Sequence, residues 1–216
     1  MKIKILYEDP NILAIEKPSG VLVHGDDRSK EKTIVDLLVK KYPKIQLAHR
    51  LDKETSGVLL LAKNAKAHQF LKEQFQARTI RKIYVAIVNG NVKNERGIIN
   101  RPIGRSPKDF RRYLAGRGAR GEMREAITDY KVLKRLPGFT VVEVRPKTGR
   151  THQIRVHMKF INHPVACDTL YNPGASNPKG IKRLALHARS IEFKNLKGET
   201  VKVESKLPKE FEKIIK

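Results

Sequence analysis

The sequence lacks several features that would place it in common protein classes. No apolar run approaches the roughly 18 residues of a membrane-spanning helix, so we expect no membrane partner. The N-terminus has neither the apolar core nor the small-residue cleavage site of a signal peptide. The single cysteine, Cys167, cannot form a disulfide within the chain, which favours a reducing, cytoplasmic location. Linkers, repeats and low-complexity tracts are also missing, which is typical of a globular domain.

Acidic residues are scarce as well. Only 22 Asp and Glu stand against 46 Lys and Arg, which gives a formal net charge of +24. Such an excess repels itself in a compact fold, so we expect a polyanionic partner, and nucleic acid is the usual one. An anionic membrane surface or a lysine-rich proteome would produce the same charge. Charge alone therefore does not separate an enzyme from a passive RNA-binding protein.

The sequence offers no convincing metal or cofactor motif. A zinc nucleobase deaminase needs at least two cysteines, and this chain has one. His152 and His157 are five residues apart without an intervening glutamate, unlike the two histidines of a zinc protease. Residues 116–121, GRGARG, fit the letters of a dinucleotide-binding loop but lack the preceding apolar strand and the following helix. We expect neither a metal nor a cofactor.

Apolar periodicity and capping residues predict a mixture of strands and helices. We expect a strand pair around the turn at residues 9–11, a helix opened by Thr33, a buried strand over 57–62 and a helix capped by Asn64. Further along, we expect strands over 80–88, 127–133 and 139–144, a helix over 151–161, and a hairpin over 191–204. Because βαβ alternation is not regular, the expected class is α+β with a mixed, largely antiparallel sheet.

Residues 101–124 interrupt the apolar pattern. They hold eight basic and two acidic side chains, a net charge of +6, together with several glycines. We interpret this segment as an exposed basic arm or long loop that follows RNA phosphates through Arg111, Arg112, Arg117 and Arg120. The alternative is a merely solvated loop.

The segment HRLDKETSG, residues 49–57, places one acid behind a basic pair and directly before the expected buried strand. Asp52 would therefore lie at a sheet edge, where burial and a nearby cation have opposite effects on its pKa. The simpler interpretation is that Asp52 caps a turn with Thr55 and Ser56. The residues by themselves leave both possibilities open.

Residues 49–63, HRLDKETSGVLLLAK, resemble the central motif of the RluA-type pseudouridine synthases. Other segments resemble motifs of the same family in the same order: residues 16–24 (EKPSGVLVH), 81–86 (RKIYVA), 148–157 (TGRTHQIRVH) and 183–188 (RLALHA). The resemblance extends from about residue 6 to about residue 210. It implies the pseudouridine synthase fold, a bent sheet flanked by helices with a central cleft. It also implies one catalytic domain over residues 1–216, without the RNA-binding domain that precedes it in many relatives.

The resemblance implies an enzyme that isomerises uridine to pseudouridine within RNA. Asp52 would bond to the ribose anomeric carbon or stabilise positive charge there, as carboxylates do in glycosidases. A covalent adduct and an elimination to a glycal both remain open. Because the reaction is neither a redox step nor a hydrolysis, no cofactor is implied. The expected substrate is ribosomal or transfer RNA, with no DNA partner, and the expected state is a monomer.

The same resemblance implies roles for further residues. Tyr84 would stack on the base and assist a proton transfer, although a tyrosine in a sheet is also a common core residue. Arg155 would keep Asp52 ionised, whereas the alternative is a solvated surface arginine. RNA contacts are expected from Arg50, which could fill the space of the flipped-out uridine, and from Lys17, Arg150 and His152.

Overall fold

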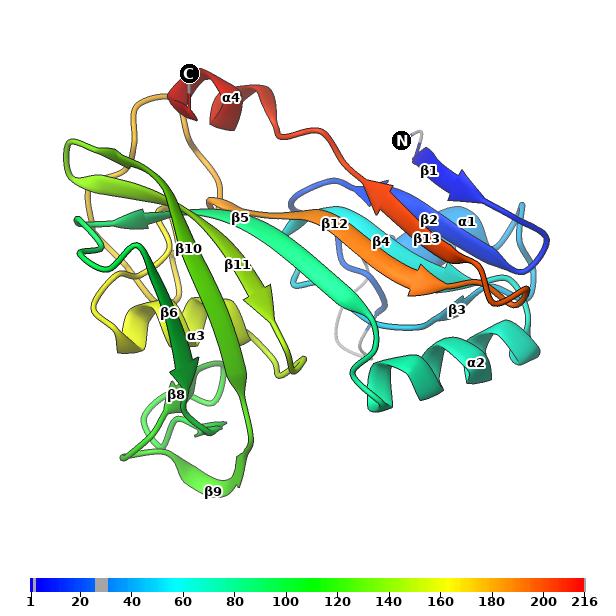
Figure 1. Cartoon of the computed structure of the whole chain (residues 1–216), viewed down its shortest axis with the longest axis horizontal. Helices are drawn as coiled ribbons and strands as arrows, with labels where there is room; N and C mark the ends of the chain where they lie inside the picture. The colour runs from blue at the N-terminus through cyan, green and yellow to red at the C-terminus, as the bar shows by residue number, and fades with distance from the viewer. Residues whose placement is uncertain (2, 26–30, 216) are drawn as a thin grey trace. The chain divides into compact units, whose positions relative to one another are not determined.

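The computed structural model describes residue 1, residues 3–25 and residues 31–215. The chain folds into two compact units, drawn in Figure 1. The first unit comprises Met1–Lys82 with Ala188–Lys206, and the second comprises Ile83–His187 with Leu207–Lys216. Over the described parts of the chain, the helices are too short or too polar to cross a membrane.

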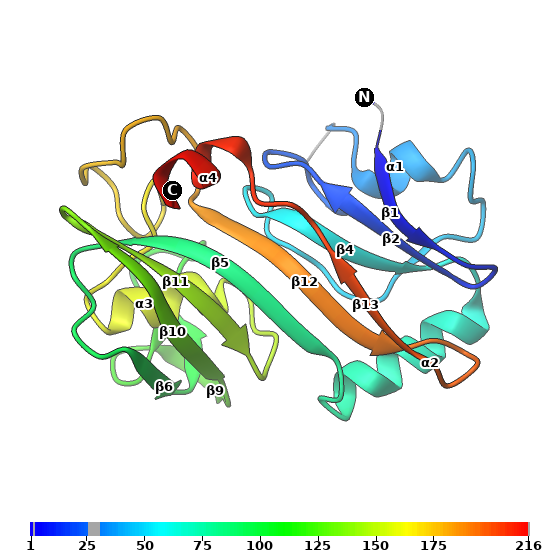
Figure 2. The same cartoon turned by 45° about the horizontal axis from the view of Figure 1, so that its top comes forward.

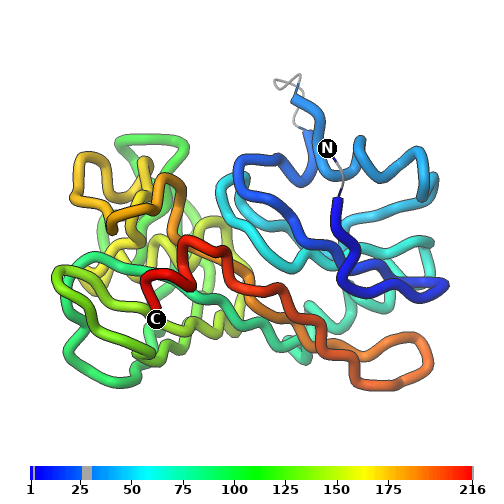
Figure 3. The backbone as a smooth tube through the Cα atoms, turned by 90° about the horizontal axis from the view of Figure 1, so that it is seen from above, coloured from blue at the N-terminus to red at the C-terminus, as the bar shows by residue number. Residues whose placement is uncertain are grey.

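The first unit is built around a sheet whose strands neighbour one another in the order β1, β2, β4, β12 and β13. These strands are β1 (Lys4–Glu8), β2 (Ile12–Lys17), β4 (Ser56–Ala62), β12 (Leu186–Lys194) and β13 (Thr200–Glu204), and the short β3 (Gln46–Leu47) also pairs with β4. The predicted strand pair is confirmed as the antiparallel β1–β2 hairpin, drawn in blue in Figure 3. The predicted tail hairpin is β12 with β13, which run side by side in Figure 2.

Both predicted helices of this unit are present. Thr33 caps α1 (Ile34–Leu38) in a reciprocal capping box with Asp36. Asn64 caps α2 (Ala65–Gln76), whose buried residues Ala67 and Leu71 pack with β2 and β4. β4 is buried along its whole length, as its continuous apolar sequence predicted.

The second unit contains an antiparallel sheet in the order β5, β11, β10, β6. Its strands are β5 (Arg81–Asn89), β6 (Arg96–Asn100), β10 (Ile127–Leu136) and β11 (Phe139–Pro146). The helix α3 (Gln153–Phe160) packs beside β10 and β11, and Met158 joins their core. The C-terminal helix α4 (Lys209–Ile215), which the sequence pattern did not predict, adds the fully buried Phe211 to the same core. The class predicted from the sequence, α+β with a mixed and mostly antiparallel sheet, is confirmed.

The basic segment 101–124 is folded, and its interpretation as an arm or loop needs correction. It forms a small antiparallel sheet in the order β8 (Tyr113–Ala115), β7 (Ile103–Arg105), β9 (Arg120–Arg124). Only β7 is strongly buried, through Ile103 and Gly104, whereas every residue of β9 is exposed. A Cβ at Gly104 would lie 2.6 Å from the Met123 sulfur and 3.0 Å from the Ala119 Cβ, so these side chains would have to shift. Backbone pairing without apolar alternation explains why the pattern did not reveal these strands.

Candidate active site

The predicted catalytic carboxylate, Asp52, lies in the turn between β3 and β4 of the first unit. Its side chain is half-buried, and its backbone carbonyl accepts a hydrogen bond from the Thr55 N–H at 3.1 Å. Leu51 anchors the turn in the core and is 5% exposed, whereas Arg50 on its other side is exposed. Leu51 therefore fixes the turn in the interior, and the Arg50 cation lies in solvent. Asp52 follows them directly in the chain.

Residues of the first motif, 16–24, hold this turn from the opposite side. Lys17 Nζ donates hydrogen bonds to the carbonyl oxygens of Lys53 and Thr55, both at 2.8 Å. The Gly20 N–H donates to the Lys53 carbonyl at 2.9 Å, and Ser19 Oγ donates to the Glu54 carbonyl at 2.6 Å. Two segments more than thirty residues apart thus form one hydrogen-bonded structure around the backbone that carries Asp52.

The structure does not place Lys17 on the surface, where the RNA-facing role predicted for it would require it to lie. Its side chain is completely buried, and Nζ also donates to the Pro18 carbonyl at 2.8 Å. A buried ammonium needs strong acceptors, and these three main-chain carbonyls supply them. In the structure, Lys17 therefore shapes the turn that carries Asp52.

His49 ties the turn to the neighbouring strand. Its Nε2 accepts a hydrogen bond from the Leu60 N–H at 3.0 Å, and its ring lies 5.0 Å from that of Phe75. Desolvation, with a smaller contribution from Lys82, lowers the pKa of His49 to about 3. An acceptor Nε2 requires the neutral imidazole with its proton on Nδ1, which agrees with that low pKa.

The strand after the turn must approach a neighbouring backbone closely. Gly57 has φ +113°, and a Cβ there would collide with the main chain of Ala188 on β12. Only glycine accepts both conditions without strain. The glycine that ends HRLDKETSG is therefore explained by strand packing directly behind the turn.

In the second unit, α3 carries Arg155 in a buried position. Its Nε donates to Asp168 Oδ2 at 2.7 Å and its Nη2 donates to Asp168 Oδ1 at 2.8 Å. The side chains of Arg155 and Asp168 are 8% and 0% exposed. Asp168 Oδ1 also accepts the N–H groups of Leu170 and Tyr171, at 3.0 and 2.9 Å. The planar fork of Arg155 is thus held in a fixed orientation by a buried carboxylate.

The other polar residues of the third motif, 148–157, are mostly structural. Thr148 Oγ1 donates to Gln153 Oε1 at 2.6 Å, and Gln153 Nε2 donates to the Ile127 carbonyl at 3.0 Å. The fully buried His157 contacts Thr128 Oγ1 and the Arg101 carbonyl, and burial lowers its pKa. These contacts fix α3 against β10 and against the start of the small sheet.

His152 and Arg150, predicted to bind RNA, lie at the entry to α3. His152 has a left-handed backbone, φ 56°, and its Nδ1 contacts Tyr171 Oη at 2.9 Å. The same hydroxyl accepts the Tyr113 N–H of β8 at 2.9 Å. Arg150 Nε donates to the Glu125 carbonyl at 2.9 Å. His152 therefore links α3 to the small sheet, and its RNA contact stays a prediction, as does that of Arg150.

Tyr84 lies near the start of β5 in the second unit, where it pairs with Val144 of β11. Its ring is partly buried and packs against the core, while the next four residues of β5 are fully buried. The structure thus places Tyr84 at the less buried end of an interior strand. Asp52 belongs to the first unit, whereas Tyr84 and Arg155 belong to the second.

The four predicted arginines of the basic segment differ in their surroundings. Arg111 pairs with Asp109 through Nε and Nη2, at 3.1 and 2.9 Å, and Arg112 Nε lies 3.4 Å from the same carboxylate. Hydrogen bonding with Arg111 lowers the pKa of Asp109 to about 2. Arg117 and Arg120 are exposed. In the part of the chain described by the structure, no three His, Cys, Asp or Glu side chains come together as a metal site would need.

Sequence reasoning missed Asp168 and Tyr171. The signal available was one acid in the apolar segment HPVACDTLY, residues 163–171, with a tyrosine three positions later. That spacing is common in surface turns and gave no reason to connect the segment with Arg155.

The fold and these motifs define the class of RNA pseudouridine synthases. The solved structure titled "Human RNA Pseudouridylate Synthase Domain Containing 1" matches 96% of this chain and 84% of its own, with a TM-score of 0.82 and 28% identity. A family model described as RNA pseudouridylate synthase matches residues 11–160. The chain belongs to this family and is an RNA-modifying isomerase.

Two bacterial relatives match nearly the whole chain. "Ribosomal large subunit pseudouridine synthase D" of Xanthomonas campestris is 35% identical over 99% of this chain and 68% of its own length. "Uncharacterized RNA pseudouridine synthase YlyB" of Bacillus subtilis is 36% identical over all of this chain and 72% of its own length.

Proposed function

We propose that this enzyme converts uridines of large-subunit ribosomal RNA to pseudouridine. The choice of RNA is supported by the name of the Xanthomonas relative, which specifies the large ribosomal subunit. The net charge of +24 suits a densely folded RNA, because phosphate neutralisation drives such binding. This substrate and the single unpaired cysteine support an action in the cytoplasm, as a monomeric catalytic domain made of both units.

The proposed chemistry is an isomerisation centred on Asp52. The bond between uracil N1 and ribose C1′ breaks, the uracil turns, and its C5 bonds to the same C1′. C5 loses its proton and N1 gains one, so electrons and atoms balance without a cofactor. The Asp52 carboxylate bonds to C1′ or stabilises the positive charge that develops there.

One observation carries the assignment of Asp52. Hydrogen bonds from Lys17, Ser19 and Gly20 fix the backbone of residues 53–55, and the half-buried Asp52 directly precedes these residues. A catalytic group performs best when its supporting structure is rigid, because little reorganisation is then needed during the reaction. The first motif supplies this support.

Tyr84 and Arg155 complete the proposal. Tyr84 stacks on the uracil and assists the proton transfer. Arg155 favours the ionised state of Asp52 during turnover, and Asp168 holds the orientation of its guanidinium. In this arrangement Arg155 acts through another group, so its contribution is distinguishable by pH dependence.

The test replaces Asp52 by Asn and measures tritium release from an unmodified large-subunit ribosomal RNA transcript labelled at uridine C5. We expect loss of turnover with retained folding and RNA affinity, because an amide is a poor nucleophile and a poor stabiliser of positive charge. Glu54→Gln is the matched control, since Glu54 is an exposed acid of the same turn whose backbone, not its side chain, bonds to Ser19. Substantial turnover by Asp52→Asn contradicts the assignment.

A further inference from the structure

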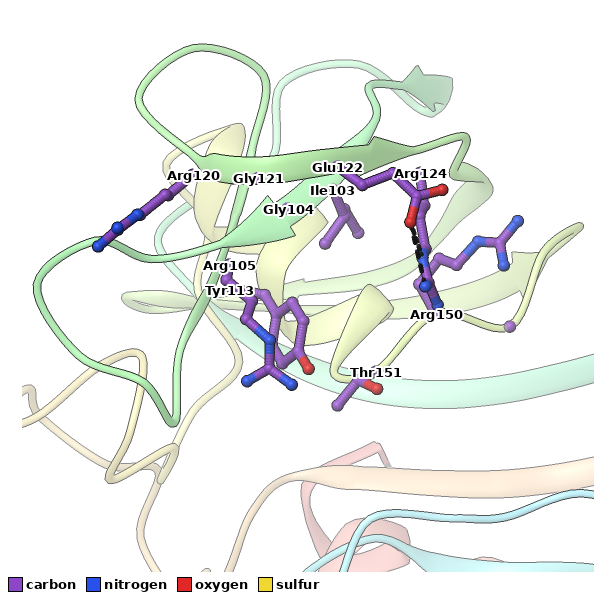
Figure 4. Close-up of a pocket in the computed structure, with 11 residues that line it drawn as sticks. Ile103, Gly104, Arg105, Tyr113, Arg120, Gly121, Glu122, Arg124, Arg150 and Thr151 are labelled. Atoms are coloured by element: carbon purple, nitrogen blue, oxygen red, sulfur yellow. Dashed lines mark hydrogen bonds and ion pairs between the residues drawn. The ribbon is translucent and has the colours of Figure 1, made fainter.

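The second unit contains a pocket of about 300 Å³ between the small sheet and the entry to α3. Its walls come from β7, β8 and β9 and from residues 149–151, so it combines the basic segment with the third motif. Figure 4 shows the side chains around it. The volume is at the lower end of the range for small-molecule sites. None of the proposed catalytic residues lines it.

The pocket is strongly cationic. Arg105, Arg120, Arg124 and Arg150 line it, against the single acid Glu122. Glu122 Oε2 accepts hydrogen bonds from Arg124 Nε and Nη2, both at 3.2 Å, and this pair is marked by dashes in Figure 4. Arg124, Arg150 and the Thr151 hydroxyl supply donors for an anion such as a phosphate, whereas the Arg120 side chain extends away from them in Figure 4. The charge excludes a metal cation as the ligand.

An aromatic ring distinguishes this pocket from a simple phosphate site. The Arg105 side chain lies beside Tyr113 in Figure 4, and its guanidinium lies over the ring. The distance from Arg105 Cζ to the ring centre is 5.5 Å. The Tyr113 N–H is bonded to the hydroxyl of Tyr171, whose side chain is 2% exposed. Unpaired RNA bases stack on aromatic rings and on arginine planes of this kind. The stacking platform formed by Arg105 and Tyr113 is thus held in place through the backbone of Tyr113, which is hydrogen-bonded to the buried Tyr171.

We propose that this pocket binds one unpaired nucleotide of the substrate RNA, distinct from the uridine that reacts. Its base stacks on the Arg105–Tyr113 platform, and its phosphate binds Arg124 and Arg150. The inference rests on the proposed function for its RNA and adds a specificity site to it. A nucleotide explains the joint presence of a stacking surface and several guanidinium groups, which a phosphate alone leaves unexplained.

The test compares Tyr113→Leu with Tyr113→Phe. Filter binding measures the Kd for the unmodified large-subunit ribosomal RNA transcript at physiological salt, and single-turnover pseudouridine formation is followed with enzyme in excess. Tyr113→Leu is expected to weaken binding by about 5- to 150-fold, the usual effect of losing one stacked base. Tyr113→Phe keeps the ring and the backbone N–H, so its Kd is expected within about twofold of the wild type. With enzyme below its Kd, the single-turnover rate of Tyr113→Leu is expected to fall together with its affinity.

A charge-matched pair separates the pocket from general electrostatics. Arg105→Gln removes a cation from the platform, whereas Arg96→Gln removes one from β6 outside the pocket. We expect the larger loss of affinity for Arg105→Gln. Ultraviolet crosslinking of wild-type protein to the transcript, mapped by mass spectrometry, is expected to attach a nucleotide at Tyr113, a result independent of how any variant folds.

Unchanged affinity of a folded Tyr113→Leu protein overturns the proposal. Equal losses in Arg105→Gln and Arg96→Gln, or crosslinks only outside the pocket, also overturn it. These failures leave wild-type turnover intact. Failure of the proposed function has a different signature, because the wild-type protein would then form no pseudouridine in the transcript.

Discussion

Asp168 accepts two parallel hydrogen bonds from the Arg155 guanidinium, at 2.7 and 2.8 Å, and both side chains are buried. The central guanidinium carbon of Arg155, Cζ, also lies 5.0 Å from the centre of the Tyr171 ring. A residue proposed to support catalysis is therefore itself supported by an acid thirteen positions further along the chain. Because the pair is buried, its loss is expected to affect both stability and turnover.

The first prediction concerns that pair. Asp168→Asn replaces an acceptor oxygen by a donor that faces the donors of Arg155, and it removes the carboxylate that holds this buried guanidinium. We expect the free energy of unfolding to fall by roughly 3–5 kcal/mol. Urea unfolding followed by circular dichroism measures this. Glu143→Gln removes the exposed pair with Arg145 and is expected to cost no more than about 1 kcal/mol. Equal small losses in both variants would contradict the prediction.

The second prediction tests whether Arg155 keeps Asp52 ionised. Arg155→Met retains bulk but removes the positive charge that is proposed to favour the carboxylate form of Asp52. Single-turnover rates measured against pH should then lose activity on the acid side at a higher pH than in the wild type. Arg155→Lys should shift this acid limb less, because it keeps the charge without the planar fork.

Asp168→Asn serves as the control in the same experiment. It disturbs the orientation of Arg155 but keeps its charge, so we expect a lower rate with the acid limb in place. An acid limb that does not move in Arg155→Met would assign Arg155 a purely structural or RNA-binding role.

The third prediction uses the low pKa of His49. In the unfolded chain its pKa is near 6.5, whereas the folded value is about 3. Between pH 6.5 and 3, His49 therefore binds a proton in the unfolded state but stays neutral in the folded state. The contribution of neutral His49 to the free energy of unfolding is therefore fully present above pH 6.5. It decreases by about 1.4 kcal/mol for each pH unit as the pH falls from 6.5 towards 3.

His49→Gln is expected to reduce the slope of the unfolding free energy against pH between pH 6 and 4. The reduction corresponds to about one bound proton, since glutamine accepts the Leu60 N–H without titrating. The exposed His24 provides the matched control, because His24→Gln makes the same substitution away from the Leu60 contact. Urea unfolding at several pH values measures both. A wild-type slope retained in His49→Gln would show that another group is responsible.

The fourth prediction distinguishes the arginines of the basic segment. Asp109 already neutralises part of the charge of Arg111 and Arg112, whereas Arg117 and Arg120 are exposed. Replacing Arg117 and Arg120 by Gln is expected to weaken RNA binding and to reduce the slope of log K against log salt by about 0.7–0.9 for each phosphate that is no longer neutralised. The double variant of Arg111 and Arg112 should change the slope less. The reverse order would show that the paired arginines bind the RNA phosphates.

Much of the fold was predictable because its strands and helices carry local signals. The capping residues Thr33 and Asn64 and the apolar run of β4 placed their elements closely. The helix predicted to begin at Thr151 begins at Gln153, because His152 adopts a left-handed backbone that no pattern revealed. The small basic sheet was missed since its strands are held by backbone pairing with little apolar burial.

The candidate site was predictable only in its motifs. Resemblance identified Asp52, Tyr84 and Arg155, yet it did not reveal what holds them. The bonds of Lys17 to the turn join residues 36 and 38 positions apart, and the partner of Arg155 is an acid outside every motif. Such contacts depend on tertiary structure, and the resemblance that suggested an RNA-facing role for Lys17 did not show them.

Lys17 Nζ clamps the Asp52 turn through three hydrogen bonds, and this clamp affects which positions of the sequence are able to vary. Its three acceptors are main-chain carbonyls, which every amino acid provides. Substitutions at Lys53 or Glu54 therefore leave the clamp intact, and their side chains are able to adapt to a new RNA surface. A change at position 17, in contrast, removes the ammonium that donates to all three oxygens. Rigidity of the turn and evolvability of its outer face are thus encoded at separate positions.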